Sequence, residues 1–379
     1  MAKHTRARVT TVAAAVALAA VTFTASPASA TSARAAGGTV FVQTDSPDGN
    51  AVVAFDRMTD GSLRQKAVYR TGGRGGVLDG SVADHTASQG ALTYDSRHHL
   101  LFAVNPGSDS VTVFAVTGDR LTKLQTIGSG GTFPVSIAVH DNRVFVLNAR
   151  AGGSLQGFVL LAGHLVPVPL WHRALGFDAD AAPEFTHTAA QVAFTPDGGS
   201  LVVSTKAAGD SVITFPLNPV FGPSAKPVVD STGAGSVPFG FVFDGSGRIL
   251  LTEAGPNAIV TGRVDGRGKL STGTPVATGQ QATCWIAAAG DFAYVANAGS
   301  GTVSGYRIGA DGTPVSLGTT PAGAGTVDLA TTPDGRYLYA QTGADGGVSA
   351  FRINHDGSLT SAGHVVLDGA AGGEGIVAL

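Results

Sequence analysis

The sequence predicts an all-β fold, a seven-bladed β-propeller with four-stranded antiparallel blades and a ring closed by pairing of the N- and C-terminal strands. Two sequence patterns support this: an apolar segment that recurs seven times, and tight Asp-Gly turns that flank it. The composition agrees, since 54 of 379 residues are Gly and only 13% are charged. Such a composition is typical of disorder or of a turn-dense β fold, and the regular apolar runs favour the β fold.

The recurring segment is a run of β-branched and aromatic residues that ends in a polar residue. Its seven copies lie at 39–43, 100–105, 143–148, 201–206, 249–253, 293–297 and 338–341. A run of this kind is typical of a buried strand that leads into a loop. The copies follow one another at intervals of about 44 to 60 residues, which is the length of a propeller blade.

Tight turns bracket each segment. Asp197-Gly198 and Asp334-Gly335 precede apolar runs, and Asp60-Gly61, Asp311-Gly312 and Asp356-Gly357 follow third strands. Asp-Gly between apolar runs indicates a hairpin, because Gly accepts a positive φ without steric cost. Calcium binding is the alternative role for these aspartates. The repeated oxygen-ligand spacing of a calcium loop is absent, so turn chemistry is favoured.

The termini support ring closure. The first copy, 39–43, stands at the second-strand position of its blade, and the chain ends in 374–379, an apolar segment that resembles a first strand. Pairing these two segments completes one blade, because stacked blades in a closed ring leave few exposed edges. We therefore expect residues 38–379 to form one propeller domain.

The first thirty residues have the features of a cleavable Sec-type signal peptide. Lys3, Arg6 and Arg8 precede an apolar run that is shorter than a membrane span, and small residues lead up to Ala30. We expect cleavage near Ala30, a short flexible N-terminus at 31–37 and secretion to the extracellular space.

Charge and cysteine content narrow the functional classes. The net charge is −3, with no basic cluster after the leader, which argues against nucleic acid as a partner. The single cysteine, Cys284, excludes an internal disulfide. We expect a monomer with no cofactor, no bound metal and no membrane attachment after cleavage.

The repeats resemble those of the lactonase family of seven-bladed propellers, which includes 6-phosphogluconolactonase and carboxymuconate cyclase. The resemblance rests on Asp197-Gly198, Asp334-Gly335 and 294–297, Tyr-Val-Ala-Asn, a YVTN-like repeat, and it extends from about residue 38 to the end. It implies a secreted bacterial protein that hydrolyses or forms a small lactone without a cofactor. Active members often carry Pro-Arg-His and Asn-Glu at two positions where this chain has Ala190-Gln191 and Thr205-Lys206.

The resemblance also places the functional face. The loops that enter the first strands and leave the second strands open on one face, around the central channel. The candidate ligand-binding residues there are Gln89, Asn105, Ser136, Asn148, Gln191, Asn297, Asp328 and Gln341. Gln43 and Glu374 occupy equivalent strand ends. Strand-end polar residues are also ordinary solvated caps, so the pattern alone does not separate the two roles.

Lys206 and Glu253 are the candidate catalytic residues. They stand on adjacent blades at positions where other blades carry neutral amides. A structural ion pair is one interpretation. The other is a lysine of lowered pKa beside a carboxylate, acting as a base or an oxyanion stabiliser.

Two long loops, 71–84 and 171–184, are expected on the same face and are candidates for binding walls. Each ends in a related phrase that begins at His85 or His187. These histidines are either loop anchors or metal ligands, and their spacing gives no support to a metal site. Cys284 is expected to be a small buried hydrophobic residue rather than a nucleophile. The sequence leaves two functions open: a lactonase-like enzyme, or a non-catalytic propeller that binds a wall component, a glycan or a protein.

Overall fold

The computed structural model describes residues 1–2 and 36–379. The chain divides into two units, Met1–Arg34 and Ala35–Leu379, and every strand found among the described residues lies in the second. The expected signal peptide and flexible N-terminus lie almost entirely outside the described residues. Within the described part of the chain, no helix has the length and apolar character needed to span a bilayer.

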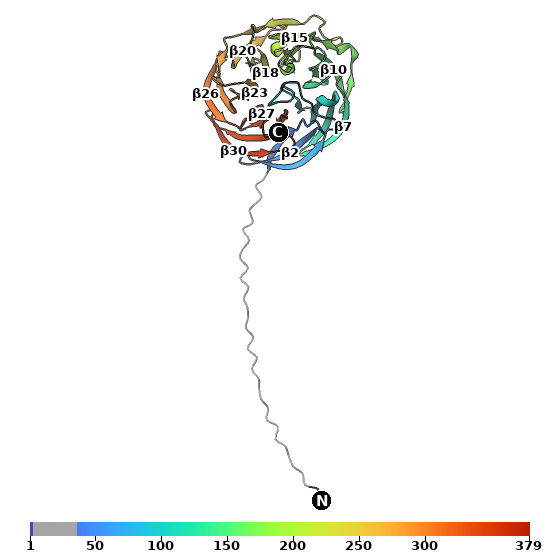
Figure 1. The fold of residues 1–379 in the computed structure, drawn as a ribbon, viewed down its shortest axis with the longest axis vertical. Coiled ribbons are helices and arrows are strands. Elements are labelled where there is room, and N and C mark those ends of the chain that lie inside the picture. Colours follow the sequence, from blue (N-terminus) through green and yellow to red (C-terminus); the bar gives the residue numbers. More distant parts are fainter. Residues whose placement is uncertain (3–35) are drawn as a thin grey trace. The chain divides into compact units, whose positions relative to one another are not determined.

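The predicted seven-bladed propeller is confirmed, and Figure 1 shows its blades arranged around a centre. Blade one contains β1 (Ala36–Gln43), β2 (Ala51–Met58), β3 (Leu63–Arg70) and β31 (Ile376–Ala378). Blade two contains β4 (Leu92–Asp95), β5 (Leu100–Asn105), β6 (Ser110–Thr117) and β7 (Arg120–Gly128). Blade three contains β8 (Pro134–His140), β9 (Arg143–Asn148), β10 (Ser154–Leu161) and β11 (His164–Pro167), with β12 (Arg173–Ala174) beside β10.

The remaining blades repeat this order. Blade four contains β13 (Gln191–Phe194), β14 (Ser200–Ser204), β15 (Ser211–Asn218), β16 (Gly222–Pro223) and β17 (Val228–Ser231). Blade five contains β18 (Pro238–Phe243), β19 (Ile249–Glu253), β20 (Ala258–Val264), β21 (Leu270–Thr272) and β22 (Val276–Ala277). Blade six contains β23 (Thr283–Ala289), β24 (Phe292–Asn297), β25 (Thr302–Ile308) and β26 (Pro314–Pro321). Blade seven contains β27 (Thr326–Thr331), β28 (Tyr337–Thr342), β29 (Gly347–Ile353) and β30 (Leu359–Val366).

Helical structure is limited to short turns. In the part of the chain that the structure describes, these are four 3-10 segments: η1 (Pro106–Ser108), η2 (Pro169–Trp171), η3 (Glu184–Thr186) and η4 (Lys206–Ala208). Two of them, η3 and η4, lie on the loops that form the functional face described below.

Ring closure is as predicted. β31, from the C-terminus, pairs antiparallel with β1, and Phe41 faces Val377 in the register. The backbone N–H of Gln43 donates to the carbonyl of Gly375 at 2.8 Å, and that of Leu379 donates to Thr39 at 2.8 Å. Both ends of the propeller therefore contribute to blade one, so the ring has no free seam.

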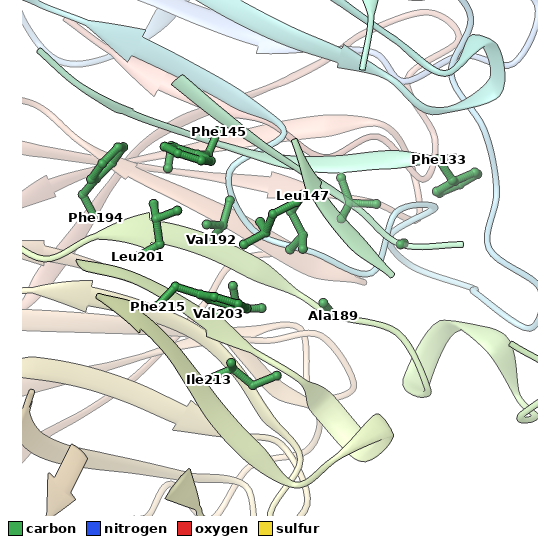
Figure 2. Packing of buried hydrophobic residues seen from close by; sticks show 14 of the residues in the cluster. Phe133, Phe145, Leu147, Ala189, Val192, Phe194, Leu201, Val203, Ile213 and Phe215 are labelled. Carbon is green, nitrogen blue, oxygen red and sulfur yellow. The ribbon is translucent and has the colours of Figure 1, made fainter. Parts of the chain in front are cut away.

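The core lies between neighbouring blades. Figure 2 shows one such layer, where Phe145 and Leu147 of β9 pack with residues of β13, β14 and β15. The Phe145 ring stacks on Trp171 at 5.7 Å and meets Phe194 edge-on at 5.8 Å. Second strands such as β5 and β28 are buried along their whole length, which explains their nearly continuous apolar sequence.

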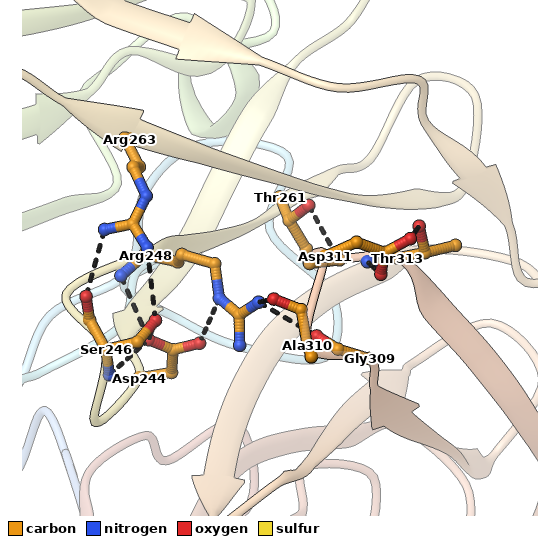
Figure 3. Close-up of polar contacts among 10 residues, drawn as sticks. Asp244, Ser246, Arg248, Thr261, Arg263, Gly309, Ala310, Asp311 and Thr313 are labelled. Atoms are coloured by element: carbon orange, nitrogen blue, oxygen red, sulfur yellow. Dashed lines mark hydrogen bonds and ion pairs between the residues drawn. The ribbon is translucent and has the colours of Figure 1, made fainter.

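The Asp-Gly turns are stabilised by their own aspartates (Figure 3). The carboxylate of Asp244 accepts hydrogen bonds from the backbone N–H groups of Ser246 at 2.8 Å and Arg248 at 3.0 Å. The Arg248 guanidinium also donates to Asp244 at 2.7 Å and reaches the carbonyl of Gly309 in blade six at 2.9 Å. At Asp311-Gly312 the glycine has φ +91°, as a tight turn requires. These carboxylates serve the turn geometry that the sequence predicts.

Candidate functional site

The segment 84–90, called here the central segment, lies against inner strands on several sides of the ring. It links blade one to blade two, yet it contacts the inner strands of distant blades. The Trp285 indole N–H of β23 donates to the Ser88 carbonyl at 2.6 Å, and the Ser88 hydroxyl donates to Val135 of β8 at 2.9 Å. The N–H of Gln89 donates to Ala190 at 3.2 Å. The central segment therefore fills the channel mouth, a role that the sequence did not indicate.

Lys206 fastens two loops together. Its side chain is 1% exposed, and its ammonium donates to the carbonyls of Ala87 at 2.7 Å and Phe185 at 2.5 Å. The first carbonyl belongs to the central segment and the second to η3, which follows the long loop 171–184. The ammonium also lies 5.7 Å from the centre of the Phe239 ring. Lys206 thus acts in this structure as a clamp between the loops.

Burial lowers the pKa of Lys206 to about 7, and the negative charge of Asp84 is the strongest influence in the opposite direction. Glu253, at the end of β19, is 4% exposed, and burial raises its pKa. Among the described residues, none forms a hydrogen bond or ion pair with its carboxylate, and neither group shifts the pKa of the other. The structure therefore does not bring together the two residues expected as a catalytic pair.

Two glutamines of the predicted ring bind backbone rather than facing a ligand. The Gln89 amide donates to the carbonyl of Ile286 and accepts from its N–H, both at 3.0 Å. Gln191 makes the same double contact with Phe241 of β18, at 2.9 and 2.7 Å. Each side-chain amide therefore pairs with the backbone of an inner strand of another blade, as a neighbouring strand would.

Three further ring residues are also held within the fold. Asn105 donates to Thr112 at 3.0 Å and accepts from Asn50 at 3.1 Å. The Asn297 carbonyl oxygen accepts from Thr283 at 2.6 Å. Ser136 donates to the Gln89 carbonyl at 2.8 Å. Asn105 and Asn297 end β5 and β24 as expected, whereas Ser136 lies inside β8. All three side chains are fully buried and have internal partners.

The last two amides have spare hydrogen-bonding capacity. Asn148 donates to Ser154 at 3.5 Å, and its carbonyl oxygen is buried without a partner among the described residues. Gln341 donates to the Gln43 carbonyl at 3.3 Å, while its own oxygen and the whole Gln43 amide are unpartnered in the described structure. Neither Asn148 nor Gln341 lines the pocket described below.

Three buried carboxyl groups lie in or beside the central segment. Glu374 lies 3.2 Å from the Thr86 hydroxyl and 3.1 Å from the Ser88 hydroxyl, and it accepts from the N–H of Gly90 at 3.0 Å. Asp328 accepts from Ile376 N–H at 3.1 Å. Burial raises the pKa of Asp328 to about 7, and burial together with the charge of Asp328 raises the pKa of Glu374 well above its usual range. The two carboxyls therefore hold a proton at mildly acid pH.

Asp84 is the third carboxyl of this group. It accepts from the N–H and hydroxyl of Thr86, both at 2.8 Å, and from the N–H of Ser88 at 2.9 Å. Burial raises its pKa, and these hydrogen bonds oppose the rise. Although Asp84 stands at the edge of a long loop in the sequence, only the fold brings it near Lys206, Asp328 and Glu374.

A pocket of about 400 Å³ opens on this face. Its walls come from the first long loop, the central segment, η3 and blades five, six and seven. The lining residues are Ser81, Val82, Ala83, Asp84, Ala87, Phe185, Phe239, Ala282, Cys284, Trp285, Ala298, Gly299, Gly325 and Ala344. Phe239 and Trp285 meet edge-on at 5.0 Å. Such a concave, mainly apolar site with a few polar groups is typical of small-molecule binding.

Of the two long loops expected as binding walls, the first lines this pocket through residues 81–84, and no described lining residue belongs to 171–184. Arg150 of blade three holds the second loop through two hydrogen bonds to Glu184, at 2.6 and 2.9 Å, and Glu184 accepts from the N–H of Asp79 on the first loop at 2.7 Å. His187 bonds locally to Thr186 and Pro183. In the described part of the chain, no group of three or more His, Cys, Asp or Glu side chains is arranged to hold a metal ion.

Cys284 is the pocket residue that sequence analysis assigned to packing. It is 9% exposed, and burial raises the pKa of its thiol to about 12. A thiol with such a pKa is almost wholly protonated at neutral pH, so it is a poor nucleophile.

Comparison with known proteins shows which family and which solved structures this chain is similar to. The model of the family described as "Lactonase, 7-bladed beta-propeller" matches residues 251–374, which lie in the last three blades and the segment that follows them. The resemblance to the lactonase family is confirmed. No curated protein matches the chain.

Solved structures of similar fold extend over nearly the whole propeller. A candidate 6-phosphogluconolactonase from Bacteroides fragilis has 18% identity and a TM-score of 0.73, covering 90% of this chain and 97% of that one. The periplasmic gluconolactonase of Pseudomonas aeruginosa has 18% identity and a TM-score of 0.72, covering 90% and 98%. Virginiamycin B lyase from Staphylococcus aureus is more distant, with 13% identity and a TM-score of 0.54, covering 78% and 89%. At these identities the likeness to the lactonase-like propellers establishes a shared fold.

Proposed function

We propose that this lactonase-like propeller is a secreted enzyme that opens a small lactone with water, without a cofactor, in the pocket on its ring face. One observation carries the proposal. The pocket of about 400 Å³ combines apolar and aromatic walls with a carboxyl group, that of Asp84, of raised pKa. A concave apolar site of this kind shields part of a bound ring from bulk water and leaves one group able to exchange a proton.

Lactone opening needs little more than an oriented water and a proton acceptor. The water oxygen bonds to the ring carbonyl carbon, the ring C–O bond breaks, and the leaving alkoxide takes up a proton. Asp84 is suited to receive the proton from water, because one of its oxygens accepts only the Ser88 N–H at 2.9 Å and Asp84 is among the residues that line the pocket. Glu253, unpartnered among the described residues, is the second candidate base. Lys206 acts by holding Phe185 and Ala87 in place.

Non-catalytic binding is the second candidate function, and a specific observation favours it. Most polar residues of the predicted ring are hydrogen-bonded within the fold, and the Lys206 ammonium is already bound to two carbonyls. A protein built only to hold a ligand would have such an arrangement, because it needs shape and apolar contact but no free acid or base.

The test is acid release in a pH-stat from aldonolactones, muconolactones and acyl-homoserine lactones. The full-length chain is compared with Ala344→Leu, which fills the pocket from an exposed position, and with Glu253→Gln. Turnover that Ala344→Leu abolishes while the melting temperature is unchanged supports the enzyme and its site. Binding without turnover supports the second function. If the protein neither binds nor hydrolyses any of these lactones, both candidate functions are refuted.

Secretion is tested with the same full-length chain in a bacterial host. We expect the protein in the culture medium, with an N-terminus that begins at Thr31. A retained protein that still starts at Met1 contradicts the expected leader.

A further inference from the structure

The pocket has no cation to offer a ligand. Of the described residues that line it, none is Lys, Arg or His, and Asp84 is the one charged side chain. The nearby Lys206 is 1% exposed and bound to two carbonyls. Arg150, which holds the second long loop, is bound to both oxygens of Glu184. A phosphate or carboxylate in this pocket would therefore meet a carboxyl group and no counter-ion.

The walls favour an apolar ligand instead. Phe185, Phe239 and Trp285 form the aromatic part of the surface, and alanines at 282, 298 and 344 leave room between the blades. The indole N–H of Trp285 is already bound to Ser88 at 2.6 Å, so the ring presents carbon to the ligand. Burying an anion without a partner is strongly unfavourable, whereas burying methylene groups is favourable.

We propose that the ligand is an uncharged lactone that carries an alkyl chain, and that phosphorylated or carboxylated sugar lactones are excluded. This inference rests on the proposed function and specifies its substrate class. The lactone ring lies toward Asp84, and the chain lies against Phe239 and Trp285. Selectivity follows from two features: the absence of a free cation at the pocket, and the carboxyl group that repels a second negative charge.

Calorimetric titration of the full-length protein with two sets of probes tests this. The first set is γ-butyrolactone, γ-hexalactone, γ-octalactone and γ-decalactone. The second is glucono-δ-lactone and 6-phosphoglucono-δ-lactone. We expect affinity in the first set to rise roughly fourfold for each added methylene until the pocket is filled. We expect no measurable binding of the phosphorylated lactone.

A variant that adds a positive charge at the rim of the pocket provides a second test. Val82 lies at the pocket and its side chain is 89% exposed, so Val82→Arg should fold normally while placing a guanidinium at the rim. We expect it to weaken γ-decalactone binding and to make binding of 6-phosphoglucono-δ-lactone detectable. The matched control is Val220→Arg, because Val220 is 71% exposed and does not line the pocket. This control should leave both affinities unchanged.

The outcomes separate the two levels of the proposal. If 6-phosphoglucono-δ-lactone binds best and Ala344→Leu abolishes that binding, the site stands and the substrate class is overturned. If alkyl lactones bind equally well to Ala344→Leu, the pocket is the wrong site and the inference falls. If neither set of lactones binds or is hydrolysed, the proposed function fails and the inference fails with it.

Discussion

Removal of the last six residues, Glu374–Leu379, should destabilise the whole ring. The deletion removes β31, whose Ile376 is 5% exposed, and frees the edge of β1. Burial of one Ile contributes about 2 kcal/mol, and three backbone hydrogen bonds that join Gly375 and Leu379 to β1 contribute about 1 kcal/mol each. Loss of Glu374 also leaves the hydroxyls of Thr86 and Ser88 without this acceptor. The expected loss, about 5 kcal/mol or more, is comparable to the whole stability of many domains.

The assay is urea unfolding followed by circular dichroism, with thermal melting as a second measurement. Two point variants provide a graded comparison. Ile376 belongs to the core between blades one and seven, so Ile376→Ala should cost about 2 to 5 kcal/mol. Val377 faces the other side of β31 and is partly exposed, so Val377→Ala should cost less. A deletion variant with an unchanged urea midpoint and melting temperature would refute the closure argument.

Three further predictions concern the loops and the buried ionisable groups. Because burial lowers the pKa of Lys206 to about 7, the unfolded chain holds a proton above pH 7 that the folded chain lacks. The free energy of unfolding should therefore rise between pH 7 and 9 by up to about 1.4 kcal/mol per pH unit. The measurement is the urea midpoint as a function of pH. If the midpoint of Lys206→Met rises as steeply with pH as that of the unsubstituted protein, the prediction is wrong. The pKa of Asp328 is raised to about 7, so the folded chain holds the extra proton between pH 4 and 7. Stability should fall as pH rises through that window, and Asp328→Asn should flatten the fall in the same titration. A Cβ at Gly343 would lie 1.7 Å from the Ala83 carbonyl oxygen, so Gly343→Ala should displace the first long loop at Ala83. We expect this variant to bind ligand at least tenfold more weakly and to be cleaved faster by proteases near Ala83. Unchanged affinity and unchanged cleavage rates would contradict the prediction.

The placement of the candidate site residues shows where sequence reasoning succeeded. Asn105, Asn148 and Asn297 end strands of the fold as the sequence predicts, since position along a strand is a local property. Ser136 and Asp328 lie inside β8 and β27, and Gln89 precedes β4. Their partners are not local. Lys206 binds Ala87, 119 residues away, and Trp285 binds Ser88, 197 residues away. The sequence pattern around Lys206 and Glu253 therefore could not show that they do not pair.

The sequence by itself determined the number of blades, the hairpin turns and the closure of the ring. These follow from apolar periodicity and from glycine at positive φ, which act over a few residues. Only the tertiary structure decided that residues 84–90 fill the channel, that Asp84, Asp328 and Glu374 share one buried region, and that the pocket has no cation. The physical reason is that burial, and with it pKa and hydrogen-bonding capacity, depends on contacts between segments that chain order does not bring together.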